Sequence, residues 1–469
     1  MHTLDDRQSD EPASTPPPKW VPLLDWSALL LLGLAANVVV FGGFRGEVAG
    51  IRLSVRSWER LAIAAVLIIA IRHAYVRTPS MPRKYWAKLS SLRRTEEWRE
   101  VWPAFIATRL GVLMAGYLAV VTIGFEAPRT RSDDILADLP ARWDALWYLS
   151  IVTDGYQWDG NPRTQQNVVF FPAFPAAIRI VGWFLGKQWL HAGLLLALAA
   201  FFCALLYLYR LARDVLGLEK AGIAVWALAA YPFSVYYSAP YTEAFYLLGS
   251  VATFYHVGKN QWWRGACWGF FAAVSRPNGF LIALPVAILV VPEIVRRRRV
   301  LLSASAAVLA PIVGILTYSY FLHVRFDDAM AWRKGQEAWG RVYVGVWPSI
   351  RALWIDRYDA IATDGFYHYS VTHPYDVFHT TAALFALASV WPTIRRFGLA
   401  YGAFTAANIV PPLLVGGMMS IGRMSSVLFP AFLWLGAILP ARHAPAWIAI
   451  FCVLQGLIAV LFFTWRPVF

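Results

Sequence analysis

Residues 189–209 read "WLHAGLLLALAAFFCALLYLY", an apolar run with no Asp, Glu, Lys or Arg in it. A helix of this length crosses the roughly 30 Å hydrocarbon core of a bilayer with its backbone groups bonded internally. Similar runs recur from about Leu23 to Phe463, and the chain of 469 residues is 58% hydrophobic and only 15% charged. The sequence therefore predicts an all-α polytopic membrane protein.

We predict about 13 transmembrane helices from runs of this kind. They cover residues 23–44, 58–76, 102–124, 189–209, 221–238, 241–257, 264–277, 279–295, 300–323, 376–394, 398–418, 424–441 and 446–464. Residues 1–20, which are acidic and contain a triple proline, are predicted to form a disordered cytoplasmic tail. Residues 21–100 then supply two N-terminal transmembrane helices and a basic cytoplasmic loop.

The net charge of +14 comes from basic residues that gather in short loops. These loops fall within residues 72–99, 210–220, 296–299 and 395–396. Such an arrangement is the positive-inside pattern, so the charge reports membrane orientation rather than nucleic-acid binding. With the N-terminus inside, every one of these loops is cytoplasmic.

The apolar segment 168–186, "VVFFPAFPAAIRIVGWFLG", is left out of the crossings. A crossing here would place the basic loops at 210–220 and 296–299 on the outside, against the positive-inside pattern. Its prolines and Arg179 suit a helix that lies against the outer face. We expect an interfacial helix, with a true crossing as the alternative.

Several polar elements then share the outer face, on the predicted topology. They are the loops 125–168 and 325–375, the span ends 236–245 and 275–279, and the turn 420–426. No acidic residue lies at the centre of a predicted span, whereas a proton-driven transporter is expected to have one. The polar chemistry is concentrated at one water-facing end instead.

Each element also has a purely structural interpretation. The aromatic residues around Trp143 can form an interfacial belt, and Asp144 can cap the helix that "ALWYLSI" predicts. Arg276 and Arg423 can anchor span ends to headgroup phosphates. Asp133 and Asp134 can be solvated loop charges. What favours a functional site is the placement of all these elements on one face.

Five motifs in order resemble the PIG-V-type mannosyltransferases, over about residues 100–440. "RWDALWYLSIVTDGYQWDGNPRTQQNVVFFPAFP" (142–175) is similar to the family's first extracytoplasmic loop, with its Trp-Asp, Gly-Tyr and Phe-Phe-Pro elements. The other four are "YYSAPYTEAFY" (236–246), "SRPNG" (275–279), "GQEAWGR" (335–341) and "GRMSSVLFPAF" (422–432). Met424 stands where the family pattern has an aromatic residue.

The resemblance implies a GT-C glycosyltransferase with a helical first extracytoplasmic loop and a catalytic domain at residues 101–465. Such an enzyme transfers a sugar from a polyprenyl phosphate with inversion at the anomeric carbon. The resemblance implies mannose, and a pentose carried on a decaprenyl-type lipid fits the same residues. It implies Asp144 as the catalytic base. The substrate-binding residues carried over are Arg142, Trp143, Tyr148, Tyr156, Phe171, Pro172, Tyr241, Glu243, Arg276, Asn278, Gln336, Trp339, Arg341 and Arg423.

The residues themselves support a lipid-linked donor. The outer face has no supply of nucleotide sugars, so an activated sugar must arrive there on a lipid. Arginine forks at the membrane rim suit its phosphate. The acceptor is a glycolipid, a glycan or a protein. Two other classes fit the same motifs: a flippase or transporter of a lipid-linked sugar, and a non-catalytic partner of another glycosyltransferase.

No cofactor is required by this interpretation. The sequence has no phosphate-binding glycine loop, and Cys203, Cys267 and Cys452 lie in apolar runs without metal-ligand spacing. A divalent metal is possible at Asp133 and Asp134 but is not indicated. The predicted partners are a polyprenyl-phosphate sugar, the acceptor and membrane lipids, without nucleic acid. The predicted location is the cell membrane, with the site on the extracytoplasmic face.

Overall fold

The computed structural model describes residues 20–41, 44–48, 51–55, 57–76, 95–125, 135–297 and 302–468. Four sequence predictions therefore lie outside the described residues: the tail up to residue 19, most of the basic loop at 77–94, the pair Asp133 and Asp134, and the end of the basic run at 298–299. The chain divides into two compact units. The first comprises Met1–Thr95 and Phe184–Gly186, and the second comprises Glu96–Trp183 and Lys187–Phe469.

The first unit is a helical hairpin joined by two short strands. Helix α1 (Trp20–Phe41) packs on α2 (Trp58–Tyr75), and β1 (Phe44–Val48) pairs antiparallel with β2 (Ile51–Val55). The strands were not predicted, although "IRLSV" alternates apolar and polar residues as strands do. A buried ion pair joins the helices, with Arg72 Nε 3.0 Å from Asp25 Oδ1. Because a buried charge needs its partner, this pair fixes the register of the two helices.

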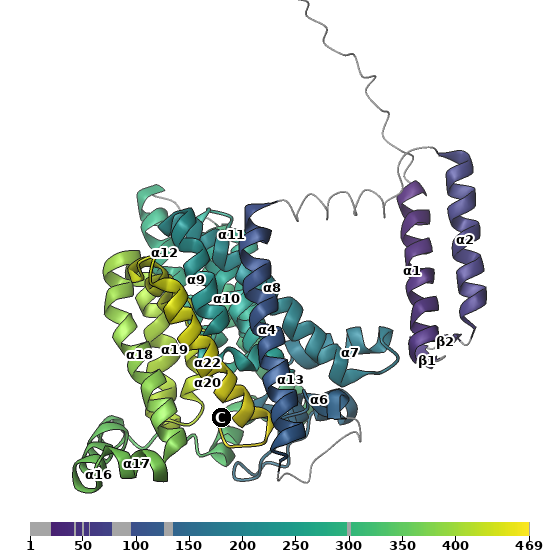
Figure 1. Cartoon of the computed structure of the whole chain (residues 1–469). Coiled ribbons are helices and arrows are strands. Elements are labelled where there is room, and N and C mark those ends of the chain that lie inside the picture. The colour runs from purple at the N-terminus through teal and green to yellow at the C-terminus, as the bar shows by residue number, and fades with distance from the viewer. Residues whose placement is uncertain are drawn as a thin grey trace, which may run out of the picture. The chain divides into compact units, whose positions relative to one another are not determined.

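The second unit is almost wholly helical (Figure 1). Its α-helices are α4 (Glu96–Thr122), α5 (Ile135–Asp138), α6 (Ala145–Asp154), α7 (Ala173–Phe184), α8 (Trp189–Leu216), α9 (Leu218–Ala230), α10 (Glu243–Gly258), α11 (Trp262–Ala273), α12 (Ala283–Arg297), α13 (Leu302–Phe326), α14 (Ala331–Lys334), α15 (Val346–Ile350), α16 (Asp356–Asp364), α17 (Phe366–Thr372), α18 (Pro374–Phe397), α19 (Leu399–Gly416), α20 (Ile421–Ser425), α21 (Phe429–Ile438) and α22 (Ala444–Phe463). Between them lie the 3₁₀ helices η1 (Asn167–Val169), η2 (Pro232–Ser238), η3 (Pro277–Ile282) and η4 (Gly335–Trp339), and the π-helix η5 (Arg351–Ile355).

The all-α polytopic fold class is confirmed, but the predicted count of transmembrane helices is not. Among the described residues, eight helical segments are long and apolar enough to cross a membrane: α1, α4, α8, η3 with α12, α13, α18, α19 and α22. The other predicted crossings correspond to α2, α9 with η2, α10, α11, and α20 with α21.

Two predicted crossings are not continuous helices. In the segment 221–238, α9 ends at Ala230 and the chain continues as a 3₁₀ helix from Pro232, a residue that has no N–H to donate. In the segment 424–441, α20 ends at Ser425 and α21 begins only at Phe429. Both sequence predictions are corrected here, because apolar composition alone does not reveal a break in the backbone.

Helix α7 lies in segment 168–186, for which the absence of a membrane crossing stays a prediction. It has 12 residues, a length of roughly 18 Å at 1.5 Å per residue, which is too short for the hydrocarbon core. Among its described residues, the predicted first outer loop contains α5, α6 and the start of η1, and residues 155–166 between α6 and η1 are not helical.

The long helices of the second unit pack in pairs that bring distant segments together. Helix α11 packs on α10 and α13, α18 on α19, α9 on α21, and α22 on α4. In Figure 1, α6, α16, α17 and the C-terminus all lie towards the same end of this bundle. Segments from the two predicted outer loops therefore meet at one end of the helices.

The predicted orientation can be tested by cysteine labelling. In a variant whose three cysteines are replaced by alanine, Asn161→Cys is expected to react with a membrane-impermeant maleimide in intact cells. Asn161 is exposed in the loop after α6, which the basic loops place outside.

The control is Lys259→Cys, an equally exposed position in the loop after α10, which the same topology places in the cytoplasm. It should react only after permeabilisation. Labelling of Lys259→Cys but not of Asn161→Cys in intact cells would show that the predicted topology is inverted.

Candidate active site

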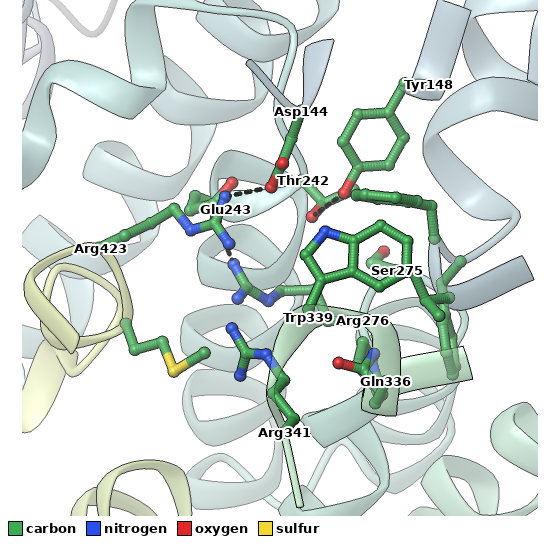
Figure 2. A pocket seen from close by; sticks show the side chains of 15 residues that line it. Asp144, Tyr148, Thr242, Glu243, Ser275, Arg276, Gln336, Trp339, Arg341 and Arg423 are labelled. Carbon is green, nitrogen blue, oxygen red and sulfur yellow. Dashed lines mark hydrogen bonds and ion pairs between the residues drawn. The ribbon is translucent and has the colours of Figure 1, made fainter. Parts of the chain in front are cut away.

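Several segments far apart in the sequence line one cavity in the second unit (Figure 2). They come from the start of α6, the chain before α7, the start of α10, the chain into η3, η4 and its end, and α20. The lining residues are Asp144, Tyr148, Val169, Phe170, Phe171, Thr242, Glu243, Ser275, Arg276, Pro277, Gln336, Trp339, Arg341, Arg423 and Met424. All five motifs singled out in the sequence thus contribute to one cavity.

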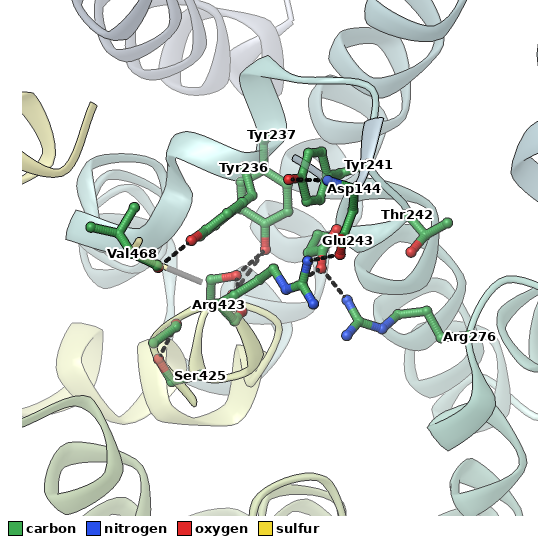
Figure 3. A network of polar contacts seen from close by, with 12 residues as sticks. Asp144, Tyr236, Tyr237, Tyr241, Thr242, Glu243, Arg276, Arg423, Ser425 and Val468 are labelled. Carbon is green, nitrogen blue, oxygen red and sulfur yellow. Dashed lines mark hydrogen bonds and ion pairs between the residues drawn. The ribbon is translucent and has the colours of Figure 1, made fainter. Parts of the chain in front are cut away.

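An ion-pair network occupies one wall of this cavity (Figure 3). Arg423 Nη1 donates to Asp144 Oδ2 at 2.5 Å, and Arg423 Nε lies 3.3 Å from Glu243 Oε1. Glu243 Oε1 also accepts a hydrogen bond from Arg276 Nη1. The side chain of Glu243 is only 2% exposed and that of Asp144 is 24% exposed. The two carboxylates are therefore held by two arginines, and Asp144 is the one that remains open to the cavity.

Arg341 adds a third guanidinium to the same cavity (Figure 2). Within the described part of the chain, no acidic side chain forms an ion pair with it. Burial and the neighbouring guanidinium groups of Arg423 and Arg276 lower the pKa of Arg341 to about 10. At neutral pH it is still protonated, so three guanidinium groups face two carboxylates in the cavity, which has a net attraction for an anion.

The turn before α6 sends the side chains of Trp143 and Asp144 in different directions. Trp143 has a φ of 51°, in the left-handed region that bulky residues rarely adopt. Its ring packs against Trp465, with centroids 5.0 Å apart, while Asp144 faces the cavity. Such a conformation costs of the order of 1–3 kcal/mol and persists where the surroundings impose it. The strain is stored directly beside the carboxylate.

Asp144 occupies the N-cap position of α6, but its side chain makes no capping hydrogen bond. Its carboxylate is used by Arg423 instead. The interpretation of Asp144 as a simple helix cap is therefore not supported by its contacts.

Arg142 is buried behind the cavity rather than in it. Its Nη1 donates to Asp138 Oδ2 at 3.0 Å, and its Nε donates to the carbonyl of Phe463 at 2.9 Å. Because α5 and α22 are tied together by these bonds, Arg142 stabilises the outer loop. It does not line the cavity in which a substrate role was predicted.

Two tyrosines support Asp144 and Arg423 from outside the cavity (Figure 3). The hydroxyl of Tyr241 accepts a hydrogen bond from the backbone N–H of Asp144 at 3.0 Å and donates to the carbonyl of Arg142 at 3.3 Å. The guanidinium carbon of Arg423 lies 5.7 Å and 5.6 Å from the ring centroids of Tyr236 and Tyr241. These aromatic faces stabilise the cation and fix the geometry of the ion pair.

The aromatic wall of the cavity includes three of the six aromatic residues predicted as substrate-binding, Tyr148, Phe171 and Trp339. The hydroxyl groups of Tyr148 and Thr242 are 3.0 Å apart. Trp339 stands edge-on to Phe170, with centroids 5.9 Å apart. Phe171 and Gln336 also line the cavity. Flat rings beside hydrogen-bonding groups suit the ring face and the hydroxyl groups of a sugar.

Asn278 lies apart from this group. Its Nδ2 donates a hydrogen bond to Asn408 Oδ1 at 2.7 Å. The hydroxyl of Tyr246 donates to the same oxygen at 2.6 Å. These two bonds join η3 to α19 and α10. Asn278 does not line the cavity.

Tyr156 and Pro172 line a second cavity, of about 550 Å³. Its wall is mostly apolar and comes from α6, α7 and α13, with Arg179 and Arg325 among the lining residues. The two cavities share neighbouring backbone. Phe171 lines the first and Pro172 the second, and likewise Ser275 lines the first and Val274 the second. They therefore lie on opposite sides of the same chain segments.

The described residues offer no group of three or more His, Cys, Asp or Glu side chains that could hold a metal ion. Within the cavity the acidic side chains are Asp144 and Glu243, and both are engaged by arginines. Asp133 and Asp134 lie outside the described residues.

Sequence reasoning missed some of the lining residues. Thr242 lies between the predicted residues Tyr241 and Glu243. Ser275 directly precedes the predicted residue Arg276. Their presence in the quoted motifs was the available signal.

Comparison with known proteins finds similarity in solved structures alone. No family model matches the chain, and no curated protein matches it. The chain is similar to ArnT from Cupriavidus metallidurans bound to undecaprenyl phosphate, with 13% identity over 78% of this chain and 76% of that chain and a TM-score of 0.44. It is also similar to the Archaeoglobus fulgidus oligosaccharyltransferase tethered with an acceptor peptide, with 14% identity, a TM-score of 0.40, and coverage of 76% of this chain and 55% of that chain. This chain therefore matches little more than half of the oligosaccharyltransferase. At these TM-scores the similarity assigns neither a family nor an activity.

The charge balance of the cavity predicts opposite effects for two arginine substitutions. Folding lowers the pKa of Arg341 to about 10. Below that pH the protonated side chain therefore destabilises the folded chain relative to the unfolded chain. Arg341→Met is therefore expected to raise the melting temperature of the ligand-free protein in detergent.

Arg276→Met is the matched control, with the same substitution in the same cavity. It removes one of the two arginines that hold the buried Glu243, so the melting temperature should fall. A lower melting temperature for Arg341→Met would contradict the absence of a counter-charge at Arg341.

Proposed function

We propose that the protein is a membrane glycosyltransferase of the GT-C type that uses a polyprenyl-phosphate sugar on the extracytoplasmic face. The observation that carries the proposal is the cavity in which Arg276, Arg341 and Arg423 converge beside Asp144. A phosphate group and a nucleophilic hydroxyl are the two reactants that such a set of side chains accommodates. The sequence motifs that resemble PIG-V-type mannosyltransferases supply the same residues independently.

The arginines match the charge of a lipid-linked donor. Three guanidinium groups face two carboxylates, which leaves one positive charge in excess, and the phosphodiester of a polyprenyl-phosphate sugar carries one negative charge. Guanidinium forks bind phosphate oxygens in a bidentate manner. Arg341, which has no acidic partner among the described residues, is the arginine that gains most from the phosphate.

The reaction needs a base on one side of the sugar and a leaving group on the other. In our proposal Asp144 accepts the proton of the acceptor hydroxyl while that oxygen bonds to the anomeric carbon. The bond from the anomeric carbon to the phosphate oxygen breaks, and its electron pair leaves with the polyprenyl phosphate. The arginines stabilise this departing charge. Attack opposite to the leaving group inverts the anomeric carbon.

The second cavity suits the lipid part of the donor. It is mostly apolar, has a volume of about 550 Å³, and adjoins the first cavity across residues 171–172 and 274–275. An isoprenoid chain placed there buries apolar surface at about 25 cal/mol per Å² while its phosphate reaches the arginines. In this arrangement Tyr156 and Pro172 contact the lipid rather than the sugar.

Mannose is the sugar that the sequence resemblance favours. The acceptor is a glycolipid, a glycan or a protein, presented from the open side of Asp144. The proposal requires neither a metal nor another cofactor.

Transfer from a labelled donor tests the proposal directly. Purified protein incubated with radiolabelled polyprenyl-phosphate mannose and a set of membrane glycolipid, glycan and peptide acceptors is expected to release polyprenyl phosphate and label an acceptor. Asp144→Asn should lower kcat by at least about 10²-fold, since it removes the proton acceptor.

Two controls make this experiment decisive. Asp138→Asn removes a carboxylate from the same outer loop that pairs with Arg142 and does not line the cavity, so it should affect folding yield but not kcat of the folded protein. Movement of the intact donor from one leaflet of a vesicle membrane to the other, without release of polyprenyl phosphate, would instead establish a flippase. A fully active Asp144→Asn would end the base assignment.

The lipid cavity yields a separate prediction. Ala176 lines it, so Ala176→Trp should fill part of the space and raise the KM for a long polyprenyl-phosphate donor by about 10-fold or more. The KM for a donor with one or two isoprene units should change little.

Ala177→Trp is the matched control, because Ala177 is the next residue of α7 and does not line this cavity. It should leave both KM values near those of the wild type. Equal effects of the two tryptophans on the long donor would contradict the placement of the lipid.

A further inference from the structure

Arg109 is a buried cation at the midpoint of α4, a helix apolar enough to cross a membrane. It is 3% exposed. In the part of the chain that the structure describes, no acidic side chain pairs with it. A charge at such a depth is costly and is retained where it has a task. The cavity chemistry described above does not use it.

The hydrogen bonds that Nη1 and Nη2 of Arg109 donate lead to the broken helix formed by α9 and η2, whereas its Nε donates to Thr108 Oγ1 of α4 at 3.4 Å. Its Nη2 donates to the carbonyl of Ala229 at 3.0 Å, and its Nη1 donates to the carbonyl of Ser234 and to Ser238 Oγ, at 2.6 Å and 3.0 Å. The guanidinium carbon also lies 4.8 Å from the ring centroid of Phe201. One side chain thus bonds to both sides of the break.

A broken helix in a membrane needs such a partner. The last carbonyls of α9 have no intrahelical donor, and water is absent from the bilayer core to replace it. Gln455 of α22 meets part of this need, because its Nε2 donates to the carbonyls of Ala229 and Tyr231 at 2.9 Å and 3.0 Å. Gln455 therefore bonds only to the end of α9 and the residue after it. Arg109 bonds to the end of α9 and also to η2.

The segment η2 leads directly to the cavity. Tyr236 at its centre faces the guanidinium of Arg423, and Tyr237 donates a hydrogen bond to the carbonyl of Ser426, next to α20, at 3.0 Å. Three residues after Ser238, the hydroxyl of Tyr241 accepts a hydrogen bond from the backbone N–H of Asp144. A shift of η2 would therefore move the supports of both Arg423 and Asp144 (Figure 3).

We propose that Arg109 is a positioning residue for the transfer reaction, acting through η2 on Asp144 and Arg423. This inference rests on the proposed function of the cavity. It assigns to a cation in the middle of α4 the role of fixing the broken helix in the one arrangement that aligns the base. Discontinuous membrane helices line substrate sites in other membrane proteins, and a rigid supporting shell is what keeps such a site aligned.

The test compares Arg109→Gln with Gln455→Leu, since both remove a side chain that bonds to the same helix break. In Arg109→Gln the shorter side chain no longer reaches Ser234 and Ser238. We expect its kcat to fall by about 10- to 100-fold, because misplacement by about 1 Å is enough for such a loss, while the donor KM stays within about threefold. Gln455→Leu should lower the melting temperature but leave kcat within about twofold.

Two further variants keep the inference falsifiable if Arg109→Gln does not fold. Arg109→Lys retains the charge and donors that can reach part of the same acceptors, so it should recover part of the lost kcat. Ser238→Ala removes only the bond to Arg109 Nη1 and should lower kcat in the same direction by a smaller factor. Unchanged kcat in every folded variant of Arg109 and Ser238 would overturn the inference.

Hydrogen exchange supplies a readout that does not depend on activity. Amides of residues 232–242 should exchange faster in Arg109→Gln than in the wild type and in Gln455→Leu. Equal exchange in all three proteins would overturn the positioning role even if the enzyme is active. If the wild type transfers no sugar, the proposed function fails by itself, and the exchange experiment still decides whether Arg109 holds η2.

Discussion

The guanidinium of Arg423 lies between Asp144 and Glu243, and the rest of the site is arranged around this contact. It joins the outer loop, α10 and the short helix α20, which are distant in sequence. Each partner is partly or fully withdrawn from water, so loss of any one leaves a charge uncompensated. This constraint explains why the cavity is well defined although its walls come from many segments. It also explains why Asp144 does not cap α6: its carboxylate has a stronger, charged partner.

A second constraint comes from the membrane. Backbone groups in the hydrocarbon core must be bonded within the protein, so the chain can leave a helix only where side chains replace the lost bonds. At the end of α9 the replacements include Arg109, Gln455 and Ser234, whose Oγ donates to the carbonyl of Leu228. The irregular segment η2 that this permits carries Tyr236 and leads to Tyr241, the two rings that face Arg423. A polar site at the end of an apolar bundle therefore depends on polar residues placed inside the bundle.

The two cavities divide the chemistry between them. Charged and hydroxyl-bearing side chains line the first, and the second is mostly apolar. The chain segments around Phe171 and Ser275 separate them. A ligand with a polar head and a hydrocarbon tail is the kind of molecule that two such neighbouring cavities accommodate together. This division is the structural basis for proposing a lipid-linked substrate rather than a soluble one.

The sequence by itself determined the membrane class and most of the long helices, and its resemblance to a known family supplied nine of the residues that meet in the cavity, among them Asp144, Arg341 and Arg423. It could do so because apolar length and local motifs are properties of neighbouring residues. Tertiary structure alone decided that Arg142 and Asn278 bond elsewhere, that α9 breaks at Ala230, and that Arg109 holds the break. The physical reason is that a polar side chain in a membrane protein goes to whichever partner the packing of distant helices brings within hydrogen-bond distance. That partner is not encoded in the residues on either side of it.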